Sequence, residues 1–291
     1  MPWAQAAGVI ALGAAGVGTG LWLSGRSWWI VGCLAAMPLV FAFGVGRWAP
    51  QLELVPPFAW VMQGRMEYAL LAPAAAVALV PPTMRLRFAR QRVLVGIFLA
   101  IVAGNYSVMP FLWPALARPR LAHLKTQIDR DEVCHQTTAY TCGPAASVTA
   151  LRKLDIDAGE SDLAVCMYTS PALGTPADVL AASLQERYAP LGLTCEYRAF
   201  DSVDELPRGT PVLAVVKFSF MVDHYVTVLD IDNDRIIVGD PAAGRLTYTR
   251  QQFEQRWRFR GVVLRRQASG IDYLQAKNTV PDANPALTPA Y

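Results

Sequence analysis

A cysteine directly before a helical pattern is the clearest candidate in the chain for a chemical role. The stretch Gln-Thr-Thr-Ala-Tyr-Thr-Cys-Gly-Pro begins at Gln136, and apolar residues at helical spacing follow it. A thiol in the first turn of a helix meets unpaired backbone N–H groups and the positive end of the helix dipole, which favour its thiolate form. Pro144 suits a first helical turn, and Gly143 lets the backbone approach a bound molecule closely. We therefore predict that Cys142 is a nucleophile.

A thiol nucleophile needs a base within hydrogen-bond reach, and the base needs a third group that fixes its orientation. Residues 131–267 contain two histidines, His135 and His224. His224 opens the apolar strand pattern Tyr-Val-Thr-Val-Leu, which would hold an imidazole rigidly at a sheet edge. Asp240 ends the next predicted strand, and neighbouring antiparallel strands can bring two such ends into contact. We expect His224 to act as general base, Asp240 to orient it, and His135 to lie in a surface loop.

Other polar groups near this cysteine receive different interpretations. The side-chain amide of Gln136 could donate a hydrogen bond to an oxyanion beside the backbone N–H of Cys142. The other cysteines of this region lack a base and a helix start in the right relation, and are interpreted as structural: Cys134, Cys166 and Cys195. If this region is outside the cell, two of them could form a disulfide, and the sequence does not select the pair. Neither CxxC pairs nor Cys/His clusters with zinc-site spacing occur, so we expect no metal and no cofactor.

The elements that must position these residues follow a helix-then-strand order. Helical spacing covers residues 142–154 and 175–188, and the second helix has a favourable start at Thr175 and Pro176. Strand patterns cover residues 194–200, 211–218, 224–231, 235–238 and 261–265, with a tight turn at Asn233 and Asp234. Helices followed by an antiparallel sheet predict an α+β domain.

The chain before this domain has the composition of a membrane protein. Hydrophobic residues make up 53% of the sequence and charged residues 17%, and the mean hydropathy is +0.27. Almost all of the apolar excess precedes residue 117, in four segments near the ~20 residues that cross a bilayer core. These segments are residues 4–23, 28–45, 58–80 and 93–113. We expect a four-helix membrane region over 1–117, a linker over 118–130, the α+β domain with Cys142 and His224 over 131–267, and a disordered tail over 268–291.

Two of the predicted spans leave alternatives to weigh. The third is interrupted by Gln63, Arg65 and Glu67, so either it begins near Met66 and is short, or these groups face the bundle interior. The first has no Lys or Arg before it and lacks a small-residue cleavage site. It is therefore interpreted as a retained anchor rather than a removed signal peptide.

The arginines between the spans predict an orientation, because short cytoplasmic loops carry an excess of Lys and Arg. Arg26 lies between the first two spans, and four arginines lie between the last two: Arg85, Arg87, Arg90 and Arg92. Placing these two loops in the cytoplasm puts the C-terminal domain in the periplasm or outside the cell. The residues that oppose this orientation are Arg47, Arg118, Arg120, Lys125 and Arg130. We expect an integral protein of a bacterial inner or plasma membrane.

The pattern of residues 131–265 resembles the bacteriocin-processing, double-glycine-leader cysteine peptidase family, a branch of the papain-like thiol peptidases. The residues that carry the resemblance are Gln136, the run Cys142-Gly-Pro-Ala, the run Asp223-His224-Tyr-Val-Thr-Val-Leu, the run Val238-Gly-Asp240-Pro-Ala-Ala-Gly, and Gln252-Phe253 with Trp257. The resemblance implies a papain-like fold. It also implies Cys142 as nucleophile, His224 as base, Asp240 as orienting residue and Gln136 as oxyanion-hole donor.

The resemblance further implies a peptide or leader-peptide substrate, cut after Gly-Gly through a thioester. Family members that export bacteriocins place the peptidase before a membrane domain and a nucleotide-binding domain, whereas this chain places it after the apolar segments. The chain has no GxxxxGK[ST] loop, so we expect it to bind no nucleotide. It also has no basic stretch interleaved with aromatic residues, so we expect it to bind no nucleic acid. The sequence thus predicts a stand-alone, membrane-anchored cysteine peptidase, with a separate export transporter as a candidate partner. The alternatives are a catalytically silent module that recruits leader peptides to that transporter, and an acyl transferase that uses the same thiol.

Overall fold

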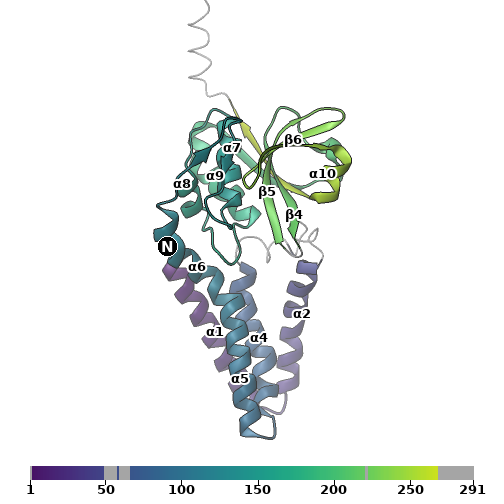
Figure 1. Ribbon diagram of the computed structural model, residues 1–291. Helices are drawn as coiled ribbons and strands as arrows, with labels where there is room; N and C mark the ends of the chain where they lie inside the picture. Colours follow the sequence, from purple (N-terminus) through teal and green to yellow (C-terminus); the bar gives the residue numbers. More distant parts are fainter. Residues whose placement is uncertain (1, 49–57, 59–65, 220–221, 268–291) are drawn as a thin grey trace, which may run out of the picture.

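The computed structural model describes residues 2–48, 58, 66–219 and 222–267. Apolar helices form the first part of the chain, and a domain of helices and strands stands on one end of them (Figure 1). The helices of the first part are α1 (Pro2–Ser24), α2 (Trp29–Trp48), α4 (Met66–Met84), α5 (Ala89–Ala103), the π-helical turn η2 (Gly104–Val108) and α6 (Met109–Leu121). Small residues let α1 and α4 pack closely, because a Cβ added at Gly16 would lie 2.5 Å from the Cα of Pro73.

Two helices of the described part are long and apolar enough to cross a membrane, namely Trp3–Ser24 and the continuous stretch Ala89–Leu121. The apolar helices Trp29–Val45 and Tyr68–Met84 are shorter. Of the residues that interrupt the predicted third span, Gln63 and Arg65 lie outside the described residues. The count of four spans therefore stays a prediction.

The two arginine-bearing loops lie together, as the charge pattern predicted. The guanidinium of Arg85 donates to the carbonyl oxygens of Ser24, at 2.9 Å, and of Arg26, at 3.1 Å. Both loops are at the end of the helices opposite to the α/β domain (Figure 1). The side of the membrane that this end faces stays a prediction.

Helix α6 extends further than the sequence pattern indicated. The fourth span was expected to end at residue 113 and the linker to begin at residue 118, but the helix runs to Leu121 with Pro114 and Pro119 inside it. Ala117 and Leu121 are buried against Ala164 of the next domain. These apolar contacts outweigh the helix-breaking tendency of proline, so the domain is joined to the last apolar helix with little intervening chain.

The α/β domain has the predicted order of helices followed by an antiparallel sheet. Its helices are α7 (Cys142–Arg152), α8 (Glu160–Cys166), α9 (Ala177–Tyr188) and α10 (Arg250–Arg256). The strands are β3 (Leu193–Ala199), β4 (Val212–Ser219), β5 (Val222–Ile231), β6 (Arg235–Asp240), β7 (Gly244–Thr249) and β8 (Trp257–Arg266), in the order β3-β8-β4-β5-β6-β7 with antiparallel neighbours. Two short strands, β1 (Gln127–Ile128) and β2 (Cys134–His135), form a separate pair.

Two apolar clusters fill the domain, one on each face of the sheet. Successive residues of β4 point to opposite faces, because strand side chains alternate. Leu213 packs with α7 and α9, whereas Ala214 belongs to the cluster that holds Phe253 and Trp257. The helices α7, α8 and α9 accordingly lie to one side of the sheet and α10 to the other (Figure 1).

Several predicted boundaries need correction. The second helix begins at Ala177 rather than Thr175, because the Thr175 hydroxyl bonds that of Thr169 at 2.7 Å instead of capping the helix. The sequence pattern missed the short elements α8, β7 and α10. The turn at Asn233 and Asp234 is confirmed, since the neighbouring Asp232 N–H donates to the Arg235 carbonyl at 3.0 Å.

Candidate active site

Helix α7 begins at Cys142, where the sequence pattern placed a helix start. Its first backbone bond runs from the N–H of Ala145 to the carbonyl of Thr141, at 3.0 Å. The thiol residue is 9% exposed, and the helix is buried from Cys142 to Leu151. A nucleophile at this position is held in one place by the packing of the whole helix.

Two contacts seat α7 on the strands that carry the other candidate residues. Thr227 of β5 is fully buried and donates its hydroxyl to the carbonyl of Ala146, at 2.7 Å. On β6, a Cβ added at Gly239 would lie 3.1 Å from Cγ2 of Thr149, so the absence of a side chain there lets the helix approach. The start of α7 is thereby fixed against β5 and β6.

His224 and Asp240 form a buried pair at the ends of these two strands. Nε2 of His224 lies 2.7 Å from Oδ1 of Asp240, and the side chains are 7% and 15% exposed. The backbone N–H of Ala242 donates to the same carboxylate oxygen at 2.8 Å. Because Nε2 is engaged, Nδ1 is the ring nitrogen left to interact with the thiol of Cys142.

The surroundings of the pair favour the charged form of both groups. Burial lowers the pKa of His224, but hydrogen bonds with Asp240 and Cys142 outweigh burial and raise this pKa to about 9. Burial raises the pKa of Asp240, and the hydrogen bonds from His224 and from the Ala242 N–H outweigh it, so the pKa falls below its ordinary value. At neutral pH the site therefore holds an imidazolium next to a carboxylate, and Sγ of Cys142 lies on the other side of the ring.

Gln136 lies close to the loop after Asp240, but its side chain is bonded within its own segment. Its backbone N–H donates to the carbonyl of Pro241 at 3.0 Å, and its Nε2 donates to the carbonyl of Thr138 at 3.0 Å. Its Oε1 is buried without a hydrogen-bond partner. The structure thus brings Cys142, His224 and Asp240 together. Among the hydrogen bonds of the described residues, none joins the side-chain amide of Gln136 to Cys142, and the oxyanion role of Gln136 stays a prediction.

The remaining cysteines and His135 have different surroundings. Burial raises the pKa of the Cys134 and Cys195 thiols to about 12, and burial also raises the pKa of Cys166. None of the five cysteines, all within the described residues, is bonded to another. His135 is part of the short strand β2 rather than a loop, and its Nε2 lies 3.0 Å from Oδ2 of Asp129.

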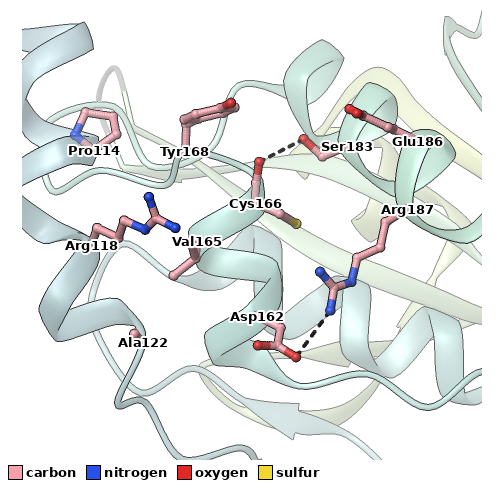
Figure 2. Close-up of a pocket in the computed structure, with 10 residues that line it drawn as sticks. All are labelled: Pro114, Arg118, Ala122, Asp162, Val165, Cys166, Tyr168, Ser183, Glu186 and Arg187. Carbon is pink, nitrogen blue, oxygen red and sulfur yellow. Dashed lines mark hydrogen bonds and ion pairs between the residues drawn. The ribbon is translucent and has the colours of Figure 1, made fainter. Parts of the chain in front are cut away.

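Two cavities, which the sequence did not predict, lie where the apolar helices meet the domain. The larger, of about 730 Å³, is bounded by α6, α8 and α9, and Arg118 extends into it from α6 (Figure 2). Across it, Arg187 bonds Asp162 at 3.3 Å (Figure 2). The smaller, of about 400 Å³, is lined by residues of α1, α4 and α6 and by Tyr168 and Val179 of the domain. Neither Cys142 nor His224 lines these two cavities.

A cysteine at a helix start that faces a histidine–aspartate pair is the arrangement used by cysteine peptidases. Residues 130–269 match the model of the Peptidase C39 family.

Relatives and solved structures resemble the same part of the chain. An uncharacterized protein of Methanothermobacter marburgensis is 28% identical over 45% of this chain and 87% of its own length. The crystal structure of the peptidase domain of Streptococcus ComA, a bi-functional ABC transporter involved in a quorum sensing pathway, is 20% identical. The alignment covers 46% of this chain and 96% of the ComA peptidase domain, with a TM-score of 0.39. A double glycine motif protease from an AMS/PCAT transporter, solved in complex with the leader peptide, is 14% identical, covers 50% and 96%, and has a TM-score of 0.41.

Proposed function

We propose that this chain is a membrane-anchored cysteine peptidase that cleaves a peptide or leader-peptide substrate. The observation that carries the proposal is the buried 2.7 Å contact between His224 Nε2 and Asp240 Oδ1, made by a ring whose other side meets Cys142 at the start of α7. The match of residues 130–269 to the Peptidase C39 family supports it.

In the proposed reaction, Cys142 and His224 react as a thiolate and an imidazolium, and Sγ of Cys142 attacks the carbonyl carbon of the scissile peptide bond. The carbonyl becomes an oxyanion, and the backbone N–H at the start of α7 lies next to the carbon that is attacked. His224 gives its proton to the departing amine as the C–N bond breaks, which leaves a thioester on Cys142. His224 then takes a proton from water, whose oxygen attacks the thioester and releases the substrate's new carboxylate and the free thiolate.

Two other residues serve this reaction in our proposal. Asp240 holds the imidazole through Nε2 and stabilises its charged form, as its effect on the pKa of His224 indicates. Gln136 supplies a second oxyanion donor once its amide turns from the Thr138 carbonyl toward the substrate. The unpaired, buried Oε1 of Gln136 supports such a turn, because its present orientation leaves one polar atom without a partner.

The proposal places the apolar helices in a bacterial inner or plasma membrane as four spans, with the domain on the periplasmic or outer side. The two helices long enough to cross a membrane support the anchor, and the paired arginine loops at the far end of the helices support the orientation. Cleavage after Gly-Gly follows from the resemblance of the sequence motifs to leader peptidases.

A peptide that carries a vinyl sulfone after Gly-Gly tests the site, because only an activated thiol adds to it quickly. Mass spectrometry of the intact protein is expected to find the adduct on Cys142, and a His224→Ala variant is expected to lose it. Equal labelling of Cys134, Cys166 and Cys195 would contradict the catalytic assignment. Peptides that accumulate uncut in cells expressing the Cys142→Ala variant then identify the substrate and its cleavage site.

A further inference from the structure

The larger cavity, about 730 Å³, lies where the last apolar helix meets the domain. Helix α6 bounds it with Pro114 and Arg118, α8 with Asp162, and α9 with Glu186 and Arg187 (Figure 2). The volume falls within the ~300–1,000 Å³ usual for ligand pockets. Such pockets are lined mainly by apolar groups, whereas this lining has charges of both signs. A ligand that fits this cavity therefore has charged groups of its own.

Two of the charged side chains in this lining compensate each other, and two do not. Arg187 bonds Asp162 at 3.3 Å. For the side chains of Arg118 and Glu186, no hydrogen bond or ion pair with another described residue is found. Both residues are exposed, Arg118 on α6 and Glu186 on α9. The cavity thus offers an uncompensated positive charge on its α6 wall and an uncompensated negative charge on its α9 wall.

Arg118 lies at the height expected for lipid headgroups. Trp113 and Leu116 of the same helix are exposed, and an indole side chain favours the membrane interface. Arg118 follows Trp113 by five residues, which is about 7.5 Å along a helix that rises about 1.5 Å per residue. The headgroup layer beyond the hydrocarbon core is about 5–8 Å thick on each side of a bilayer. In a membrane that surrounds the apolar helices, the cavity therefore lies at headgroup level.

We propose that this cavity binds the headgroup of a zwitterionic phospholipid, with the phosphate at Arg118 and a primary ammonium at Glu186. Arginine donates charge-assisted hydrogen bonds to phosphate oxygens, and a carboxylate accepts such bonds from an ammonium group. The acyl chains extend toward the hydrocarbon along exposed apolar side chains of α6 such as Leu116. The inference rests on the membrane anchor of the proposed function and does not require the peptidase reaction.

The lining distinguishes between headgroups by their charge and their hydrogen-bond donors. An anionic headgroup without an ammonium leaves the Glu186 carboxylate next to another negative charge. A choline headgroup has the positive charge but no N–H group, and proteins hold it with several aromatic rings. Tyr168 is the single aromatic residue among the described residues of this lining. Phosphatidylethanolamine, which has a phosphate and an ammonium with three N–H groups, therefore matches the cavity best.

The chain offers matched variants for a test. Arg118→Gln removes the positive charge and keeps a long polar side chain. Arg120 is also exposed on α6 but does not line the cavity, so Arg120→Gln makes the same change outside it. On the acidic side, the control for Glu186→Gln is Glu254→Gln on α10, across the sheet from the cavity (Figure 1). None of these four residues is buried, so we expect each variant to fold.

The full-length protein is purified in detergent until it is free of lipid, and single phospholipids are then titrated back. Native mass spectrometry gives the dissociation constant of the first bound lipid for phosphatidylethanolamine, phosphatidylglycerol and phosphatidylcholine. We expect phosphatidylethanolamine to bind about tenfold more tightly than the other two lipids, because each of them lacks the charge-assisted hydrogen bond to Glu186.

The variants separate the contributions of the two charges. Arg118→Gln is expected to weaken binding of phosphatidylethanolamine and of phosphatidylglycerol about tenfold, because both lipids have a phosphate. Glu186→Gln should weaken binding of phosphatidylethanolamine alone, because phosphatidylglycerol has no ammonium. Arg120→Gln and Glu254→Gln should bind each lipid within about twofold of the wild type. Soluble glycerophosphoethanolamine should bind at least about 100-fold more weakly than the lipid, because it has no acyl chains to bury.

Equal affinities for the three lipids would overturn the inference, as would equal losses in the control variants. Tight binding of glycerophosphoethanolamine would also overturn it, since the ligand would then come from solution. A changed KM for peptide cleavage in Arg118→Gln and Glu186→Gln, with lipid binding unchanged, would assign the cavity to the substrate.

Extraction of membranes at alkaline pH without detergent tests the anchor separately. If this treatment releases the protein, the anchor itself is wrong and the inference fails with it. If the protein stays in the membrane but shows no lipid selectivity, the anchor stands and the inference alone is overturned.

Discussion

The start of α7 and the strands β2 and β3 place the same side chain, cysteine, in opposite chemical surroundings. Cys142 begins a helix and faces the His224 ring, which a carboxylate holds at 2.7 Å. Cys134 on β2 is buried and Cys195 on β3 is partly buried among apolar groups, and burial raises the pKa of both thiols to about 12. The strand cysteines are therefore neutral thiols that fill space, and position in the fold decides the chemical surroundings of each sulfur.

The strongest way to break this comparison is to remove one thiol from each type of surroundings. Cys142→Ala is expected to lower peptide cleavage by about 10⁴-fold or more, because the covalent route is lost. Cys195→Ala is the matched control and should keep cleavage within about twofold, since it removes only a partly buried apolar contact. The measurement is the cleavage rate of a fluorogenic leader peptide, with thermal unfolding as a check on folding. Comparable losses in both variants would show that position does not distinguish the two thiols.

The second change leaves the thiol in place and alters the group that orients its partner. Asp240→Asn removes the charge that helps to raise the pKa of His224, so burial is expected to bring this pKa below about 9. We expect kcat/KM to fall by about 10³-fold, as when the orienting carboxylate of a catalytic triad is lost. The basic limb of the pH profile should also move to lower pH. A profile that keeps its basic limb in place would mean that Asp240 does not act through His224.

Much of this site could be predicted because its signals are local. The helix start at Cys142 follows from a glycine–proline pair before a helical apolar pattern, and the strands with His224 and Asp240 follow from alternation and a two-residue turn. The triad then depends only on two neighbouring strands and one helix packed on them. Short elements such as α10 were missed because its seven residues are too few to show a helical apolar pattern. The capping box of Thr249 and Gln252 is nevertheless a signal that marks the start of α10.

What the sequence left out depends on contacts between distant residues. The bond from the Gln136 amide to the Thr138 carbonyl competes with its predicted oxyanion role, and no pattern reveals which one is made. The smaller cavity is lined by residues that are far apart in the sequence, among them Val9 and Val179. In the sequence, Val9 is interpreted as part of a membrane span and Val179 as part of the apolar face of a helix. Only the folded structure shows that the two residues line one cavity. Tertiary packing, rather than propensity, also decides that α6 continues through two prolines.

The third prediction compares how His224 and the strand cysteines change the unfolding free energy as the pH rises. The folded pKa of His224 is about 9 against an ordinary value of 6.5, so folding favours its protonated form. This stabilisation is fully present below about pH 6.5 and is lost as the pH rises through about 9. It corresponds to about 3 kcal/mol of unfolding free energy. Urea unfolding at pH 6 and at pH 8.5 should show most of this decrease in the wild type and little of it in Asp240→Asn.

The control for this experiment comes from the strand cysteines. Their folded pKa near 12 means that they ionise more easily when unfolded, which also lowers stability toward high pH. Because Asp240→Asn retains both cysteines, the difference between the two proteins removes this contribution. An equal loss of stability in both proteins would assign the whole pH dependence to the buried thiols.

The smallest expected effect comes from a change that alters how α7 is held on the sheet and leaves Cys142, His224 and Asp240 in place. It tests whether the position of α7 distinguishes Cys142 from the strand cysteines. Thr227→Val deletes the hydroxyl that donates to the Ala146 carbonyl at 2.7 Å, and Thr227→Ser keeps that hydroxyl while removing only a methyl group. The valine variant should lose about 1 kcal/mol of stability, because one buried hydrogen bond is removed. Since that bond seats the start of α7 on the strand that carries His224, kcat should fall several-fold in the valine variant and stay near the wild-type value in the serine variant. If both variants lose stability equally but keep kcat, packing alone places Cys142, and its advantage over the strand cysteines does not depend on this hydrogen bond.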